Sequence, residues 1–130
     1  MKTRIAINGF GRIGRNLFRL LLNHPTIEVV AINDIADNKT MAHLVKYDSI
    51  HGVLNRKVSF SEDSISIDDK SYLFFHEREI KNLDWKSINV DIVIESTGKF
   101  KTFEEINQHI LAGAKKVILS APSEVDEIKT

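Results

Sequence analysis

Three glycines near the N-terminus have the spacing of a loop that can hold phosphate groups. Gly9, Gly11 and Gly14 form the pattern G-x-G-x-x-G within "RIAINGFGRIGRNLFRLLL". The pattern alone is weak evidence, because glycines also mark plain turns and sites of close packing. Here it follows an apolar run typical of a strand and opens an amphipathic run typical of a helix, which is the context that dinucleotide binding requires.

Each glycine would have its own physical task in such a loop. Gly9 permits the tight turn, Gly11 lets the backbone approach a pyrophosphate with no Cβ between them, and Gly14 lets the helix pack closely on the sheet. The N-terminus of the helix offers unpaired N–H groups and the positive end of its dipole to the phosphates. The stretch therefore predicts a phosphate-binding turn.

A carboxylate further along the chain supports this interpretation. Asp34 ends the apolar run "IEVVAIND", roughly 20 residues beyond the glycines, where a dinucleotide-binding fold places an acid on the adenosine ribose. Asp34 alone would be read as a loop acid or a helix cap. A carboxylate accepts hydrogen bonds from ribose hydroxyls but repels a 2′-phosphate, and the neighbouring Ile35 carries no positive charge. The two residues together favour NAD over NADP.

The hydrophobic pattern predicts an α/β fold of the Rossmann type. Buried strands are expected over residues 4–8, 27–34, 91–98 and 116–120, and helices over 12–23, 38–45 and 102–113. Strands that alternate with helices indicate a parallel sheet with helices on both faces. On the first helix, the helical spacing predicts one apolar face made of Ile13, Leu17, Leu20 and Leu21.

The middle of the chain has a different pattern. Apolar residues alternate at Val58/Phe60, Ile65/Ile67 and Tyr72/Phe74, and acidic pairs interrupt them at Glu62-Asp63 and Asp68-Asp69. This predicts an inserted region of short antiparallel hairpins. We also expect a helical turn at Asp84-Trp85, and a capping box in which Thr102 and Glu105 begin the last helix.

Composition sets limits on function. The 130 residues suffice for a single domain, which is predicted to span 1–130. The 18 basic residues balance the 18 acidic ones, so the sequence lacks the basic excess that would indicate a nucleic-acid partner. The sequence contains no uncharged apolar run long enough to span a membrane. The sequence has no cysteine, hence no thiolate metal site and no cysteine nucleophile. No metal site is expected, because no metal-ligand spacing relates the five histidines (His24, His43, His51, His76 and His109).

Several longer stretches carry a family resemblance. The segments "INGFGRIGRN", "AINDIAD", "KYDSIHG", "FFHERE", "DIVIESTGKF" and "GAKKVILSAPS", in this order, resemble the N-terminal domain of phosphorylating glyceraldehyde-3-phosphate dehydrogenases. The resemblance covers essentially the whole chain. Erythrose-4-phosphate dehydrogenases share much of this domain, so the resemblance leaves the aldehyde open between these two relatives.

The resemblance implies roles for particular residues toward NAD. The backbone N–H groups of Arg12 and Ile13 would meet the pyrophosphate, and Asp34, with Asn33 beside it, would hold the adenosine ribose. Arg78 would line the adenine side. The wall of the pocket would be formed by Ser96, Thr97, Gly98 and Phe100. The nicotinamide end of the cofactor would lie near Ser120 and Ala121.

The resemblance also implies what this chain lacks. In the family, the catalytic cysteine, its partner histidine and the phosphate-binding catalytic domain come later in the sequence, so no residue here is expected to be catalytic. The whole enzyme would be a cytoplasmic homotetramer that oxidises a triose phosphate, and the chain would be its cofactor-binding part. The alternative is a freestanding NAD-binding module without catalysis.

Overall fold

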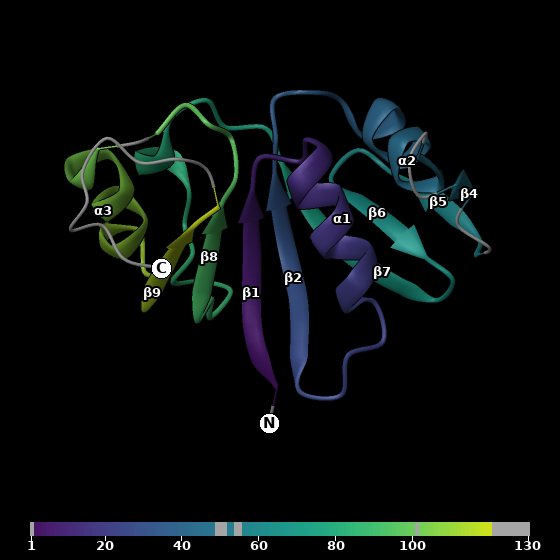
Figure 1. The fold of residues 1–130 in the computed structure, drawn as a ribbon, viewed down its shortest axis with the longest axis horizontal. Helices are drawn as coiled ribbons and strands as arrows, with labels where there is room; N and C mark the ends of the chain where they lie inside the picture. The colour runs from purple at the N-terminus through teal and green to yellow at the C-terminus, as the bar shows by residue number, and fades with distance from the viewer. Residues whose placement is uncertain (1, 49–51, 54–55, 101, 121–130) are drawn as a thin grey trace.

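A seven-stranded sheet organises the computed structural model, which describes residues 2–48, 52–53, 56–100 and 102–120 (Figure 1). The strand order is β5-β6-β7-β2-β1-β8-β9. Parallel pairs join β1 (Thr3–Asn8) to β2 (Ile27–Asn33) and to β8 (Ile92–Glu95), and β8 to β9 (Lys116–Leu119). The chain leaves β1 toward β2 on one side and returns to β8 on the other, so the strand order reverses at β1. This confirms the predicted Rossmann-type α/β class.

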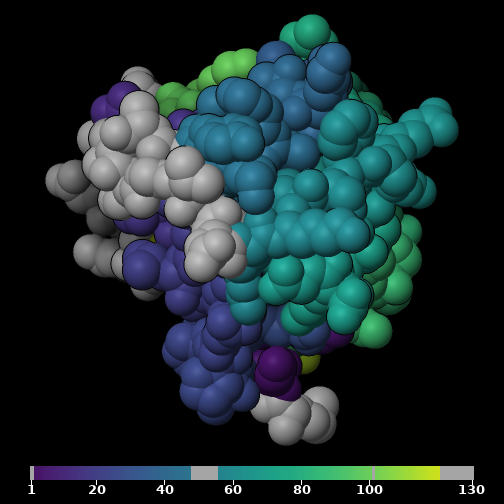
Figure 2. All heavy atoms as spheres, turned by 90° about the vertical axis from the view of Figure 1, so that its right-hand side faces the viewer, coloured from purple at the N-terminus to yellow at the C-terminus, as the bar shows by residue number. Residues whose placement is uncertain are grey.

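The predicted antiparallel region is confirmed, and it extends the main sheet. Strands β5 (Val58–Phe60), β6 (Ser64–Ile67) and β7 (Lys70–Phe75) pair antiparallel with one another, while β7 pairs parallel with β2. Figure 2 shows this end of the molecule, where α2 (Asn38–Lys46) lies beside the antiparallel strands. The sequence pattern did not predict the separate pair β3 (Tyr47–Asp48) and β4 (Gly52–Val53).

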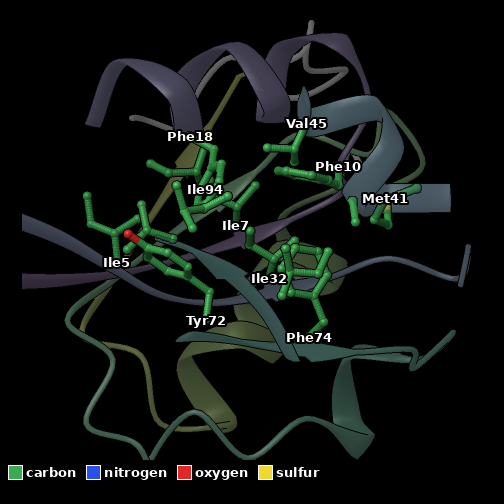
Figure 3. Close-up of a cluster of buried hydrophobic side chains, with 14 residues drawn as sticks. Ile5, Ile7, Phe10, Phe18, Ile32, Met41, Val45, Tyr72, Phe74 and Ile94 are labelled. Carbon is green, nitrogen blue, oxygen red and sulfur yellow. The ribbon is translucent and has the colours of Figure 1, made fainter. Parts of the chain in front are cut away.

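Helices cover both faces of the sheet, as predicted. On one face, α1 (Arg12–Leu21) and α2 enclose a core that includes Ile7, Phe10, Phe18, Ile32 and Phe74 (Figure 3). On the other face lie α3 (Phe103–Leu111) and the short 3₁₀ helix η1 (Ile80–Asn82). The second core gathers small and large apolar residues there: Ala6, Ala31, Leu83, Trp85, Val90, Val93 and Ala114.

Side-chain caps begin two of the helices. The Thr40 amide donates to Asp37 Oδ1 over 2.7 Å at the start of α2, and this hydrogen bond holds the pKa of Asp37 below its ordinary value. The predicted capping box is confirmed at α3: Glu105 N donates to Thr102 Oγ1 over 3.2 Å, and Thr102 N donates to Glu105 Oε1 over 3.1 Å.

The predicted apolar face of α1 is partly wrong. Ile13 and Leu20 are 51% and 71% exposed, whereas Gly14 and Phe18 are the buried residues of the helix. The glycine must face β1 because only it allows the close approach, and Phe18 lies one turn later on the same side. Leu17 packs at the edge of this face, and the orientation set by Gly14 leaves Ile13 and Leu20 outside it.

Several predicted boundaries also shift. Helix α1 ends at Leu21 rather than at residue 23, since His24 Nδ1 accepts from the amides of Thr26 and Ile27 and begins a turn there. Strand β8 ends at Glu95, not at residue 98. The helical turn expected at 84–85 lies earlier, at η1, and residues 85–89 form a turn in which Ser87 N donates to Asp84 Oδ1.

Substituting Gly14 by alanine tests whether the close approach of α1 to β1 is essential. A Cβ on Gly14 would overlap the Gly9 carbonyl oxygen and lie 3.1 Å from Ile7 Cγ2. Overpacking of this kind costs about 1–3 kcal/mol or more, so we expect the thermal midpoint of Gly14→Ala to fall by roughly 10 °C. The control is Gly11→Ala, whose Cβ meets no atom of the described residues within 4 Å. Equal midpoints for the two variants would contradict this account of the packing.

Candidate functional site

A pocket lies at the carboxyl ends of β1, β2 and β8, next to the point where the strand order reverses. In open α/β sheets this crevice is where ligands bind. Residues from four segments line it: Asn8, Gly9 and Gly11; Asn33, Asp34 and Ile35; Glu77 and Arg78; and Ser96, Thr97 and Lys99. Of the residues predicted from sequence, Gly9, Gly11, Asn33, Asp34, Arg78, Ser96 and Thr97 therefore lie together.

The glycine turn has the geometry of a phosphate cradle. Gly9 has a φ of 99°, and a Cβ there would lie 2.7 Å from the Thr97 amide nitrogen, so both the turn and the packing require glycine. Gly11 borders the pocket, and no described atom lies within 4 Å of the Cβ position. A ligand can therefore approach the backbone at Gly11 without meeting a side chain.

The N-terminus of α1 adjoins this turn. Gly11 is the N-cap, and among the described residues no side chain caps it. The first hydrogen bond of the helix runs from Arg15 N to Gly11 O over 2.9 Å, so the amides of Arg12 and Ile13 precede the helical ladder. Arg12 and Ile13 are thus the first two residues of α1, as the sequence predicted, and they lie at the positive end of the helix dipole.

Asp34 lies directly after β2 and against the glycine turn. Its Oδ2 accepts from Phe10 N over 2.7 Å, and its Oδ1 accepts from Ala36 N over 3.0 Å. Each carboxylate oxygen has a further lone pair for a hydroxyl donor. Asp34 thus has two tasks available, because it fixes the turn and it presents acceptors to the pocket.

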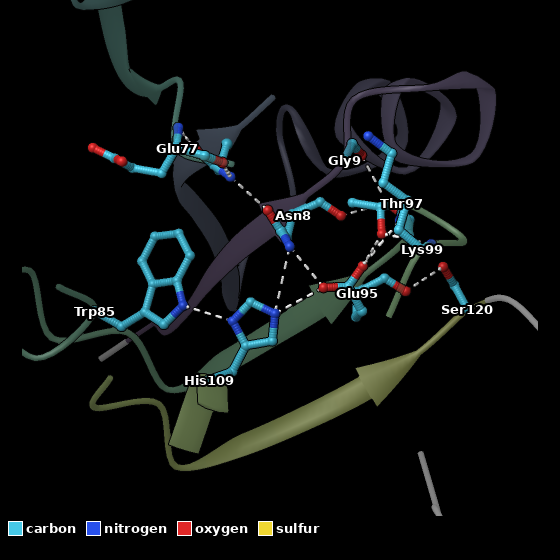
Figure 4. Close-up of polar contacts among 11 residues, drawn as sticks. Asn8, Gly9, Glu77, Trp85, Glu95, Thr97, Lys99, His109 and Ser120 are labelled. Carbon is cyan, nitrogen blue, oxygen red and sulfur yellow. Dashed lines mark hydrogen bonds and ion pairs between the residues drawn. The ribbon is translucent and has the colours of Figure 1, made fainter. Parts of the chain in front are cut away.

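The residues after β8 form the opposite wall. Ser96 Oγ donates to Gly9 O over 2.7 Å and so braces the glycine turn, and Thr97 is held by Glu95 (Figure 4). Gly98 has a φ of 74° and lies in the bend that follows β8. Phe100 is partly buried and is not among the residues that line the pocket.

Ser120 lies at the end of β9, where its amide and hydroxyl both donate to Glu95 O. Ala121 lies outside the described residues.

Asn33 borders the pocket, but its side chain is committed to the protein. Asn33 Nδ2 donates to Asn8 Oδ1 over 2.7 Å and to Glu77 O over 2.9 Å, and Asn33 Oδ1 accepts from Glu77 N over 2.9 Å. The side chain therefore holds the segment after β7 against β1. Asn33 lies beside Asp34 at the end of β2, and its hydrogen bonds indicate a supporting task.

Sequence reasoning missed four residues of the lining: Asn8, Ile35, Glu77 and Lys99. Asn8 and Lys99 could have been found, because both follow the rule that ligands meet residues at or just beyond the carboxyl ends of parallel strands. Lys99 also changes the electrostatic picture. The prediction considered only the chain neighbours of Asp34, whereas the fold brings Arg78 and Lys99 to the same pocket.

The residues present fit a dinucleotide. An open helix N-terminus and a glycine with free space suit a pyrophosphate, and a carboxylate one strand away suits a ribose. In the part of the chain that the structure describes, no group of three or more histidine, aspartate or glutamate side chains is arranged to hold a metal ion. None of the described helices has the length and apolar character needed to cross a membrane.

Comparison with known proteins agrees with this geometry. Residues 3–103 match the family described as glyceraldehyde 3-phosphate dehydrogenase, NAD binding domain. The chain belongs to this family. The match contains the glycine turn, Asp34, Arg78 and the wall after β8, so this is a domain that binds NAD.

Individual relatives are similar over nearly the whole chain. Glyceraldehyde-3-phosphate dehydrogenase of Geobacillus stearothermophilus is 51% identical over 128 residues, which are 98% of this chain and 38% of that protein. The enzyme of the same name from Thermotoga maritima is 50% identical over 127 residues, covering 96% of this chain and 38% of its own length. The chain thus spans 38% of the length of these relatives.

A valine at Gly11 tests the cradle separately from the fold. Its side chain would occupy the space beside the backbone that the pyrophosphate must enter, so we expect the affinity for NAD to fall by at least roughly a hundredfold, equal to about 2.8 kcal/mol. The thermal midpoint should stay near that of the unaltered chain, because the Cβ position is free of described atoms. Calorimetric titration and thermal unfolding measure the two effects. Retained affinity would show that the turn is only a turn.

Proposed function

We propose that the pocket at the carboxyl ends of β1, β2 and β8 is the NAD site, and that the chain is the cofactor-binding part of a phosphorylating glyceraldehyde-3-phosphate dehydrogenase. The observation that carries the proposal is the placement of Gly11, with free space beside its backbone, in one pocket with Asp34. The family match identifies the dinucleotide as NAD.

Each part of the pocket has a proposed task. The amides of Arg12 and Ile13 donate to the pyrophosphate at the start of α1, where Gly9, Gly11 and Gly14 make the approach possible. Asp34 accepts from the adenosine ribose hydroxyls, and Asn33 holds the segment that carries Arg78 on the adenine side. Ser96, Thr97, Gly98 and Phe100 form the wall, and Ser120 and Ala121 lie toward the nicotinamide end.

The bound NAD would supply a hydride acceptor to the whole enzyme. Among the residues of this chain, none supplies the thiolate that attacks the aldehyde, because the sequence has no cysteine. We therefore assign to this chain binding and orientation of the cofactor, and no catalytic residue. The substrate of the whole protein would be a triose phosphate, in line with the names of the relatives.

The family resemblance extends the proposal to assembly and location. The whole protein would be a cytoplasmic homotetramer, without a nucleic-acid or membrane partner.

Preference for NAD over NADP tests the role of Asp34. A 2′-phosphate beside this carboxylate is repelled, and about 1.4 kcal/mol of repulsion is a tenfold difference in affinity. We expect NAD to bind at least roughly tenfold more tightly, despite the cations Arg78 and Lys99 in the same pocket. Titration with both cofactors measures the ratio.

Asp34→Ala should weaken both cofactors, because Phe10 N and Ala36 N lose their acceptor, and it should narrow the ratio between them. Asp37→Ala is the matched control. Asp37 is a nearby acid that caps α2 and lies outside the pocket lining, so its removal should leave the ratio unchanged. Tighter binding of NADP by the unaltered chain would overturn the assignment of Asp34.

A turnover assay tests the division of labour. The 130-residue chain should bind NAD but form no NADH from glyceraldehyde 3-phosphate and inorganic phosphate, whereas a chain extended through the segment that the relatives carry should form it. NADH absorbance measures both. NADH formation by the short chain would contradict the proposal. If the extended chain forms NADH from erythrose 4-phosphate and none from glyceraldehyde 3-phosphate, the substrate is reassigned.

A further inference from the structure

A fully buried carboxylate lies directly behind the pocket, and none of the tasks assigned above uses it. Glu95 ends β8 and is 0% exposed, as is His109 of α3. Among the described residues, four nitrogen and oxygen atoms lie within hydrogen-bond distance of the carboxylate. Oε1 is met by Asn8 Nδ2 at 2.7 Å and His109 Nε2 at 2.8 Å, and Oε2 by Thr97 N at 3.0 Å and Thr97 Oγ1 at 2.6 Å (Figure 4).

The protonation of this cluster follows from a group at one end that can only donate. Trp85 Nε1 donates to His109 Nδ1 over 3.0 Å, and an indole nitrogen has no acceptor capacity. His109 Nδ1 must therefore be the unprotonated nitrogen, and the proton of the neutral ring lies on Nε2. That proton points at Glu95 Oε1, so His109 is a donor to the carboxylate.

The other end is fixed in the same way by the peptide backbone. Glu77 N can only donate and Glu77 O can only accept, and the side chain of Asn33 contacts both. The orientation of the Asn33 amide is therefore determined. Asn33 Nδ2 donates to Asn8 Oδ1, which turns Asn8 Nδ2 toward Glu95. Among the described partners of the carboxylate, Asn8 Nδ2, His109 Nε2 and the Thr97 amide are thus fixed as donors.

A carboxylate has about four lone-pair sites, and among the described residues three fixed donors and the Thr97 hydroxyl meet them. Both oxygens of the buried Glu95 side chain are therefore held by hydrogen bonds from β1, α3 and the segment after β8. Burial of a polar group is costly unless its hydrogen bonds are complete, which makes the cluster sensitive to geometry. The same bonds reach both walls of the pocket. Thr97 Oγ1 accepts from Lys99 N on one side, and Asn8 leads through Asn33 to Glu77 on the other.

We propose that Glu95, with His109 held in its Nε2–H form by Trp85, is a positioning unit that sets the two walls of the NAD pocket. Asn8, Glu77, Thr97 and Lys99 all line the pocket, and Glu95 holds each of them directly or through one or two hydrogen-bonded neighbours. Glu95, His109 and Trp85 do not line it, so they act through the residues that do. The inference rests on the proposed function of the pocket.

Glu95→Gln tests the unit with little change in shape. If the new NH₂ group takes the place of Oε2, it faces the Thr97 amide, which is also a donor. If it takes the place of Oε1, Asn8 and His109 cannot turn to accept from it, because Asn33 and Trp85 fix their orientations. Either way donors oppose donors, and we expect the Kd for NAD to rise at least roughly tenfold, which is the equivalent of a single strong interaction.

A matched control separates positioning from loss of stability. Ile65 is 0% exposed on β6, belongs to the core beneath α1 and α2, and does not line the pocket. The variant Ile65→Val or Ile65→Ala, whichever matches the thermal midpoint of Glu95→Gln, should bind NAD within about twofold of the unaltered chain, a difference well under the tenfold step. Calorimetric titration of the 130-residue chain with NAD gives each Kd.

A spectroscopic measurement addresses the protonation directly. The ¹⁵N–¹H spectrum of the His109 ring should show a proton on Nε2 and none on Nδ1. In Trp85→Phe the indole donor is lost, so both tautomers of His109 become available and NAD affinity should fall several-fold, although Trp85 does not line the pocket. This second variant keeps the test decisive where Glu95→Gln does not fold.

The outcomes distinguish this inference from the proposed function. If the unaltered chain does not bind NAD, the assignment of the pocket fails. If it binds and Glu95→Gln binds equally well, or no worse than the Ile65 control, the positioning role is overturned while the pocket stands. A proton on His109 Nδ1 in the unaltered chain would also overturn it.

Discussion

The close approach of the first turn to the end of β8 is the constraint on which the rest of the site depends. Side chains at Gly9 or Gly14 would occupy space that the Thr97 backbone and the Gly9 carbonyl already fill. Because these positions lack a Cβ, α1 can begin directly at the edge of the sheet, and Ser96 can close the turn with a hydrogen bond to Gly9 O. The open end of the helix dipole is thereby aimed at the crevice between β1 and β8.

The molecule combines two kinds of interior. Apolar clusters on the two faces of the sheet supply non-directional stabilisation. At the carboxyl ends of the strands a polar seam replaces them, formed by Asn8, Asn33, Glu95 and His109. Hydrogen bonds in such a buried seam are satisfied in one arrangement only, so the seam selects a single register of strands, loop and helix where the ligand must fit.

Much of the fold followed from local rules. The capping box at Thr102 and Glu105 and the hairpins after Val58 were predictable because a cap, a turn and an alternating strand are determined by residues a few positions apart. The side of α1 that packs on the sheet was not predictable from such local rules. The spacing of Ile13 and Leu20 suggested a buried stripe, yet the helix is turned by the requirement that Gly14 face β1, which is a contact between elements.

The site divides along the same line. By itself, the sequence determined the glycine turn between β1 and α1 and the acid after β2, since the types and spacing of Gly9, Gly11, Gly14 and Asp34 are local and chemically specific, and its longer segments determined the family. Only the tertiary structure decided that Lys99 and Glu77 share the pocket, that Asn33 faces the protein, and that Glu95 is buried and hydrogen-bonded to Asn8 and His109. The physical reason is distance along the chain: Asn8 and Glu95 are separated by 87 positions, and hydrogen-bond direction between such residues exists only once β1 and β8 are paired.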